Sequence, residues 1–277
     1  MRIGFIGAGK MASAIIRGLK NGPHGDSCVI TVTDRDDAAL DLLMSQVELT
    51  RADSAAEVVS RADVLLLAVK PGDVATALSQ MGALGAEKLL ISVAAGITLE
   101  TLEILAPEAR IVRVMPNTPA LVHRGAAAYA LGQRATEDDG DVVNTIFCSV
   151  GSAQRVEEKY LDAVTGLSGS GPAFVCLVIE ALADGGVREG LPRAMALQLA
   201  AQTVAGTAEL VLQTGEHPAV LRESVSSPSG TTIAGLDQLE QHAVRHAFSE
   251  AVRVASERSR ELSHALSSGS SRPGQSS

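Results

Sequence analysis

A strand, a glycine-rich turn and the start of a helix follow one another within the first twelve residues. Arg2–Ile6 is a short apolar run that leads into Gly7-Ala8-Gly9-Lys10-Met11-Ala12, a G-x-G-x-x-A sequence. In such a sequence the first glycine permits the tight turn, the second lets the backbone approach a pyrophosphate, and the final small residue lets helix and strand pack closely. Helix-start N–H groups then face the phosphates. This context constrains the segment to a βαβ unit that binds a dinucleotide.

Short apolar runs rich in Val, Ile and Leu recur through the first 157 residues, each followed by Gly, Pro, Asp or Asn. We expect strands at Arg2–Ile6, Val29–Thr33, Val64–Val69, Leu89–Val93 and Ile111–Met115, with further strands at Ala126–Leu131 and Ala153–Val156. Stretches of helical composition lie between them, among them Ala12–Leu19, Asp37–Met44 and Val74–Gly82. Strands that alternate with helices imply right-handed crossovers and a doubly wound parallel sheet. Residues 1–157 are therefore predicted to be an α/β dinucleotide-binding domain of the Rossmann type.

The strand pattern ends near Glu158. Long Ala- and Leu-rich stretches follow, at Pro172–Glu189, Pro192–Thr214, Thr231–Glu240 and His242–Leu266. Several apolar positions per turn predict helices that bury more than one face, as in a bundle or a subunit interface. We expect an all-α substrate and dimerisation domain over residues 158–266. Residues 267–277, mostly Ser and Gly with Pro, Gln and Arg, are expected to be a disordered tail.

Composition argues against several classes of partner. The chain has 277 residues, a formal net charge of −9 and only 2% aromatic residues, which does not suit nucleic-acid binding. Charged residues and glycines break the apolar runs before the roughly 18 residues of a membrane span, and we find no signal-peptide pattern. Three separate cysteines show no metal-binding spacing. We expect a cytoplasmic protein that binds neither nucleic acid, membrane nor metal.

The second expected strand ends at Thr33-Asp34-Arg35. An acidic residue at this place binds the ribose hydroxyls of NAD, whereas an adjacent Arg can pair with the 2′-phosphate of NADP. Asp34 and Arg35 therefore leave NADH and NADPH as open alternatives.

Two later loops also follow strands, Ala68–Pro71 and Met115–Pro119. Ligands of open α/β sheets lie beyond the carboxyl ends of the strands, so these loops are candidates to border the nicotinamide. The alternative is simple strand termination by proline. The predicted cofactor-binding residues are Ile6, Gly7, Ala8, Gly9, Lys10, Met11, Asp34, Arg35, Ala68, Val69, Lys70, Pro71, Met115 and Asn117.

Five ordered motifs resemble the pyrroline-5-carboxylate reductase family. They are Val69–Pro71, Arg113–Pro119, Asp162–Pro172 (DAVTGLSGSGP), Glu180–Gly186 (EALADGG) and Ser224–Thr232 (SVSSPSGTT). Together with the glycine-rich turn, they extend from Gly7 to Thr232. The last motif is usually close to SPGGTT, so Ser229 replaces a glycine, which restricts the loop or adds a donor. Glu223 likewise replaces the commoner Asp.

This resemblance implies a homodimer, or an oligomer of dimers, that reduces the cyclic imine 1-pyrroline-5-carboxylate to L-proline in the last step of proline biosynthesis. It implies that Ser227, Gly230, Thr231 and Thr232 hold the substrate carboxylate, which agrees with a Ser/Gly/Thr loop opening a helix. Glu158 matches an acidic family position near the ring nitrogen, and Thr232 is the candidate catalytic proton donor. A protonated imine accepts hydride readily, so orientation matters more than a strong acid.

Other functions find less support in the residues. Gly166–Ser170 lacks the final glycine and the preceding strand of a serine-hydrolase nucleophile elbow. His242 and His246 have a spacing that can bind metal, but Arg245 lies between them, which favours a solvated helix face. A short β-hydroxyacid dehydrogenase would be expected to carry a lysine in Pro172–Glu189, which has none. A non-catalytic NAD(P)-sensing protein is a further alternative, and its mark would be a damaged substrate loop.

Overall fold

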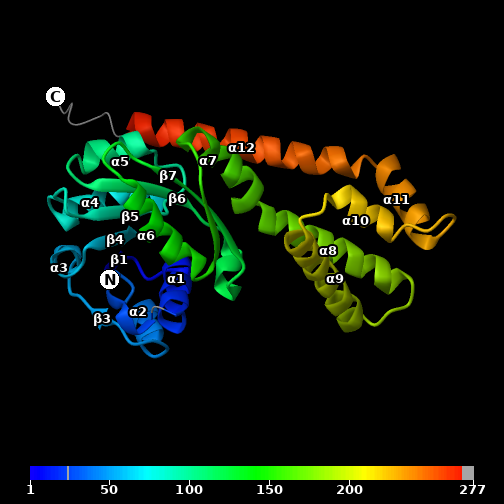
Figure 1. Ribbon diagram of the computed structural model, residues 1–277, viewed down its shortest axis with the longest axis horizontal. Helices are drawn as coiled ribbons and strands as arrows, with labels where there is room; N and C mark the ends of the chain where they lie inside the picture. Colours follow the sequence, from blue (N-terminus) through cyan, green and yellow to red (C-terminus); the bar gives the residue numbers. More distant parts are fainter. Residues whose placement is uncertain (24, 270–277) are drawn as a thin grey trace, which may run out of the picture. The chain divides into compact units, whose positions relative to one another are not determined.

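The computed structural model describes residues 1–23 and 25–269, and these form two compact units. The first unit is Met1–Ser170 together with the described residues from Arg253 onward, and the second is Gly171–Val252. Helix α12 (Val244–Gly269) begins in the second unit and ends in the first (Figure 1). The helix therefore includes residues 267–269 of the expected tail, and the remainder of that tail lies outside the described residues.

An eight-stranded sheet forms the centre of the first unit, in the order β3-β2-β1-β4-β5-β6-β7-β8 (Figure 1). Its strands are β1 (Arg2–Ile6), β2 (Val29–Thr33), β3 (Thr50–Arg51), β4 (Val64–Leu67), β5 (Leu89–Ser92), β6 (Arg110–Met115), β7 (Gly125–Leu131) and β8 (Gly151–Arg155). In the register of β1, Ile3 lies opposite Ile30 on one side and Val64 on the other. The doubly wound α/β fold is confirmed, with two differences from the expectation. The edge strand β3 has only two residues, too few for an apolar run, and β7 runs antiparallel to β6.

Seven helices accompany the sheet in the described part of the first unit, besides the end of α12. They are α1 (Lys10–Asn21), α2 (Asp37–Met44), α3 (Ala55–Arg61), α4 (Val74–Met81), α5 (Leu99–Leu105), α6 (Glu137–Cys148) and α7 (Leu161–Val164). Apolar periodicity did not predict α3, α5 and α6. Each of the three begins at a Ser or Thr whose hydroxyl accepts a backbone N–H of the first turn: Ser54, Thr98 and Thr136. Capping residues therefore carried a signal for these helices that periodicity lacked.

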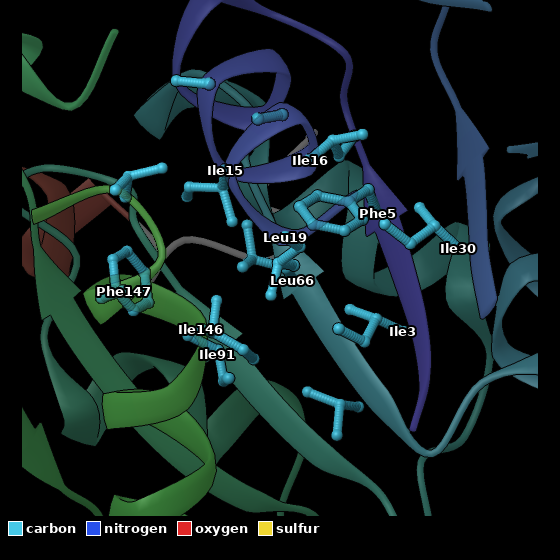
Figure 2. Packing of buried hydrophobic residues seen from close by; sticks show 14 of the residues in the cluster. Ile3, Phe5, Ile15, Ile16, Leu19, Ile30, Leu66, Ile91, Ile146 and Phe147 are labelled. Atoms are coloured by element: carbon cyan, nitrogen blue, oxygen red, sulfur yellow. The ribbon is translucent and has the colours of Figure 1, made fainter. Parts of the chain in front are cut away.

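Both faces of the sheet are buried, which explains why its central strands are continuously apolar. Alternate residues of β4 enter different cores: Leu66 belongs to one apolar cluster, and Leu65 and Leu67 to the other. Figure 2 shows the first cluster, in which strand residues pack against α1 and α6. Its labelled members are Ile3, Phe5, Ile15, Ile16, Leu19, Ile30, Leu66, Ile91, Ile146 and Phe147. This packing holds the glycine-rich turn on a rigid strand end.

The division between the units lies later than the sequence boundary at 157/158. Leu161 is fully buried in the second core cluster of the sheet. The hydroxyl of Ser259 in α12 donates to the Asp162 carboxylate at 2.6 Å. These contacts attach residues 158–170 and the end of α12 to the first unit, a long-range effect that local composition does not reveal.

In the described residues of the second unit, helices joined by loops are present and strands are not. It contains α8 (Gly171–Arg188), α9 (Arg193–Thr214), α10 (Pro218–Ser224), α11 (Thr231–Gln241) and the beginning of α12. The four expected long helices are confirmed, while the short α10 was not predicted. Pro192, expected in the first turn of α9, is its N-cap instead.

Few apolar side chains of the second unit are buried. Its buried apolar cluster consists of three alanines, Ala183, Ala196 and Ala200, whereas Leu199 and Leu212 are 53% and 79% exposed. Two helical segments, Glu158–Arg188 and Arg193–Thr214, are long and apolar enough to cross a membrane by length and composition alone. Only 11% of the most apolar 18-residue stretch in each segment is buried. This corrects the expectation that every apolar run is too short. Much of the apolar surface of these helices is therefore exposed in the single chain.

Candidate functional site

A pocket of about 730 Å³ lies at the carboxyl ends of β1, β2 and β4. This is where parallel α/β sheets bind ligands, beside the point at which the strand order reverses. Eight of the predicted cofactor-binding residues line it: Ile6, Gly7, Gly9, Asp34, Arg35, Ala68, Val69 and Lys70. Sequence reasoning missed ten others: Thr33, Asp36, Ala39, Asp53, Ser54, Ala55, Asp73, Thr76, Ala77 and Gln80. Most of these follow β3 or belong to α4, where no dinucleotide motif marks them.

The two glycines of the turn are required for different reasons. Gly7 has a φ of +105°, and a Cβ at this position would lie 2.6 Å from the carbonyl oxygen of Ala68. Gly9 has an ordinary backbone conformation, and a Cβ there would meet nothing within 4 Å. The fold itself therefore requires Gly7, whereas no protein atom requires Gly9, and its open space is available to a ligand. Because Gly9 is the N-cap of α1 and provides no side-chain cap, first-turn N–H groups are left for an anionic ligand. These features fit the pyrophosphate of a dinucleotide.

The carboxylate of Asp34 is fixed at the end of β2. It accepts hydrogen bonds from the backbone N–H of Ala8, in the glycine-rich turn, and from that of Asp36 at 2.8 Å. Asp36 in turn caps α2 by accepting from the N–H groups of Ala38 and Ala39. Two carboxylates are thus held where the adenosine ribose of a dinucleotide would lie.

Arg35 points across the same end of the pocket. Its Nη2 lies 2.9 Å from Oδ1 of Asp73, which precedes α4. The hydrogen bond to Asp73, reinforced by its charge, raises the pKa of the Arg35 guanidinium. The candidate partner of a 2′-phosphate therefore already has a carboxylate partner within the protein.

Six predicted cofactor residues do not line the pocket. Ala8 is buried, Met11 packs against the core beneath the turn, Lys10 is exposed, and Pro71 opens a short 3-10 turn. Met115 is the last residue of β6 and Asn117 follows that strand, at another part of the sheet edge. Direct cofactor contacts from these residues stay a prediction.

The Asn117 amide braces two neighbouring segments. Its Nδ2 donates to the hydroxyl and the carbonyl oxygen of Ser168, at 3.1 and 3.2 Å, and its Oδ1 accepts from the N–H of Ala126 at 2.9 Å. Ser168 lies in a single π-helical turn, Thr165–Gly169, which continues from α7. Since a helix and not a strand precedes this turn, the geometry of a nucleophile elbow is not present here.

Glu158 also has protein partners. One oxygen, Oε1, accepts from the N–H of Leu99, at the start of α5, and from Nη1 of Arg113 at 2.9 Å. Arg113 is 5% exposed, so its charge requires a nearby carboxylate. Sequence reasoning missed this role of Arg113. The contact of Glu158 with substrate stays a prediction.

The predicted substrate-binding loop lies in the second unit, where it opens α11. Gly230 is the N-cap of this eleven-residue helix and provides no side-chain cap. Its N–H donates to the carbonyl oxygen of Ser227 at 3.0 Å, and a Cβ at Gly230 would lie 2.3 Å from the Ser227 hydroxyl. Ser227 and Thr231 are exposed and Thr232 is half-buried. The structure thus gathers three hydroxyls and uncapped N–H groups, which suits a carboxylate.

Replacing Ser229 with glycine is expected to stabilise the protein. Ser229 has a φ of 57°, in the left-handed region that costs a non-glycine residue roughly 1–2 kcal/mol. Glycine removes this strain but adds entropy to the unfolded chain, so we expect a net gain of about 0.5–1 kcal/mol in the free energy of unfolding. Chemical denaturation measures this gain, with Ser226→Gly, outside the strained position, as the matched control. A loss of stability for Ser229→Gly would contradict the assignment of strain.

Among the described residues, no group of three or more His, Cys, Asp or Glu side chains is placed to hold a metal ion. His242 and His246 lie at the end of α11 and within α12.

Both parts of the chain match known protein families. Residues 158–262 match the family model of pyrroline-5-carboxylate reductase dimerisation, and residues 2–96 match that of coenzyme F420-dependent NADP oxidoreductases. A pyrroline-5-carboxylate reductase of Arabidopsis thaliana is 47% identical over 264 residues, covering 95% of each chain.

Solved structures of pyrroline-5-carboxylate reductases have the same fold as this chain. A Coxiella burnetii pyrroline-5-carboxylate reductase superposes with a TM-score of 0.87 at 33% identity, over 94% of this chain and 97% of that one. The Plasmodium falciparum enzyme, solved with NADP bound, has a TM-score of 0.82 at 32% identity, over 95% and 98% of the two chains. The chain belongs to the pyrroline-5-carboxylate reductase family.

Proposed function

We propose that this protein reduces 1-pyrroline-5-carboxylate to L-proline with NADH or NADPH as the reductant. The carrying observation is that one chain combines a dinucleotide-type pocket with an intact Ser/Gly/Thr loop and is 47% identical to a named pyrroline-5-carboxylate reductase over 95% of its length. The intact substrate loop also argues against a non-catalytic NAD(P)-sensing protein, for which a damaged loop would be expected. The P. falciparum relative with NADP bound supports the choice of cofactor class.

Different parts of the chain are assigned to the cofactor and to the substrate. We assign residues 1–157 to cofactor binding and residues 158–266 to substrate binding and dimerisation. When bound, the reduced nicotinamide supplies a hydride to the imine carbon. Gly7, Gly9 and the loop Ala68–Lys70 would hold the cofactor, because they line the pocket at the strand ends.

The hydroxyls of Ser227, Thr231 and Thr232, with N–H groups of α11, would bind the substrate carboxylate. Thr232 is the proposed proton donor to the ring nitrogen, and Glu158 the proposed acidic group near that nitrogen. A protonated imine needs little further activation, so the loop contributes mainly by orienting it.

A homodimer, or an oligomer of dimers, accounts for the exposed apolar side chains of the second unit. Met195, Leu199 and Leu210 are 50%, 53% and 47% exposed and recur along one stripe of α9. The match to a dimerisation model makes a second copy of the chain their proposed cover, rather than a membrane. We accordingly propose a cytoplasmic location.

Light scattering is expected to give a mass near twice the 28.5 kDa of one chain, or a multiple of that dimer mass. Leu199→Asp would place a charge in the interface and is expected to weaken dimerisation by at least about tenfold, since an unpaired buried charge is strongly unfavourable. Glu209→Asp on the same helix, which keeps its charge, is the control. A monomeric wild-type protein would contradict this assembly.

Oxidation of NADH and of NADPH, followed by nicotinamide absorbance with and without pyrroline-5-carboxylate, tests the reaction. Proline-dependent reduction of NAD⁺ or NADP⁺ at high pH is the reverse control. Imine-dependent turnover supports the proposed reaction. Protein that binds a cofactor but shows no imine-dependent oxidation would instead favour another imine or a sensing role.

A further inference from the structure

The pocket carries more acidic than basic side chains, which does not suit the binding of a 2′-phosphate. Its lining contains four carboxylates, Asp34, Asp36, Asp53 and Asp73, against two cations, Arg35 and Lys70. An additional phosphate brings nearly two negative charges, so its binding depends strongly on a cation that is free to pair with it.

Arg35 is the cation next to the ribose end of the pocket, and it is not free. Its Nη2 lies 2.9 Å from Oδ1 of Asp73, in a pair whose side chains are 73% and 36% exposed. The two residues come from different crossovers, Arg35 from the end of β2 and Asp73 from the turn before α4. The turn itself is held by the N–H of Asp73, which donates to the carbonyl oxygen of Lys70 at 2.9 Å. Asp73 is thus placed by backbone structure, whereas the Arg35 side chain is long and able to move.

Two other carboxylates of the pocket, unlike that of Asp73, accept hydrogen bonds from backbone N–H groups. Asp34 accepts from the N–H groups of Ala8 and Asp36, and Asp36 caps α2. Asp73, in contrast, makes no side-chain cap to α4. Its carboxylate can therefore be changed without removing a helix cap, and the interaction that the change removes is the pair with Arg35.

We propose that Asp73 is a specificity-determining residue that shifts the cofactor preference toward NADH by holding Arg35 in an ion pair. A 2′-phosphate must displace Asp73 from Arg35 and then lie beside the displaced carboxylate. The ribose hydroxyl of NADH leaves the ion pair intact. This inference rests on the proposed function, because it assumes that the pocket binds a nicotinamide dinucleotide.

Equilibrium binding tests this proposal without turnover. Titration calorimetry with adenosine 2′,5′-bisphosphate and with 5′-AMP gives the affinity ratio between the phosphorylated and unphosphorylated ligands, and NADP⁺ and NAD⁺ give the same ratio for whole cofactors. We expect Asp73→Asn to raise this ratio by about three- to tenfold, because the pair is solvent-exposed and its strength is therefore limited. The increase should shrink at high salt, since salt screens exposed charges.

Two comparisons separate the ion pair from the general charge of the pocket. Asp53→Asn removes an equal charge from the same lining, and we expect a smaller change in the ratio. In an Arg35→Gln background, Asp73→Asn should lose most of its effect, because the two residues act through one contact. Equal shifts for Asp53→Asn and Asp73→Asn, or an Asp73→Asn effect that persists without Arg35, would overturn the proposal.

A ratio that is unchanged or lowered in Asp73→Asn would also overturn it, the lowered ratio meaning that Asp73 orients Arg35 for the 2′-phosphate. A wild-type protein that binds neither NAD⁺ nor NADP⁺ would instead overturn the proposed function itself. Asp73→Ser, measured alongside, checks that the effect follows from the lost carboxylate and not from the asparagine side chain.

Discussion

Replacing Gly9 with valine is expected to lower the affinity for NADH and NADPH by about a hundredfold or more, which corresponds to about 2.8 kcal/mol. A Cβ at Gly9 meets no protein atom within 4 Å, so the added side chain enters the space into which a pyrophosphate would approach the start of α1. The folded protein is expected to tolerate the change, with a melting temperature within about 2 °C of the wild type, as for a surface substitution.

Calorimetric titration and thermal denaturation measure these two effects separately. Gly9→Ala is the graded control and should weaken cofactor binding less than Gly9→Val. Gly7→Ala should behave differently, because its φ of +105° and the Ala68 carbonyl oxygen 2.6 Å from the added Cβ make it destabilising as well. Normal cofactor affinity in Gly9→Val would show that the pyrophosphate does not lie against this turn.

Thr232→Val is expected to lower kcat/KM for the imine by about 10- to 100-fold, the size of a lost hydrogen bond to a charged group. Valine keeps the shape of threonine but has no hydroxyl, so packing of the half-buried side chain at the start of α11 is retained. The cofactor dissociation constant should change little, because Thr232 is assigned to the substrate.

Steady-state kinetics together with cofactor titration checks this assignment. Thr232→Ser retains the hydroxyl and should recover most of the activity, which separates a hydrogen-bonding role from a packing role. A fall in kcat at unchanged KM would favour the proton-donor role, whereas a rise in KM alone would favour substrate binding. Equal weakening of cofactor binding would contradict both roles.

Local sequence signals were sufficient for much of the fold. The bounds of β1, β2 and α2 agree with the expectation residue for residue, because each is an apolar or amphipathic segment with a Gly or Asp directly beside one of its ends. The capped helices α3, α5 and α6 were not predicted; α3 and α5 have only seven residues each, too few for a clear apolar period. The edge strand β3 was missed because two residues form no pattern.

For the candidate site, too, local sequence specified some features and tertiary structure specified others. The amino-acid sequence by itself determined the glycine-rich turn, the strand ends around it and the loop that opens α11, because these depend on residues adjacent in the chain. Only the tertiary structure decided that Arg35 pairs with Asp73 and that Glu158 pairs with Arg113. Those pairs join residues that are far apart in the chain, and their approach follows from strand order and helix packing, which no local pattern encodes.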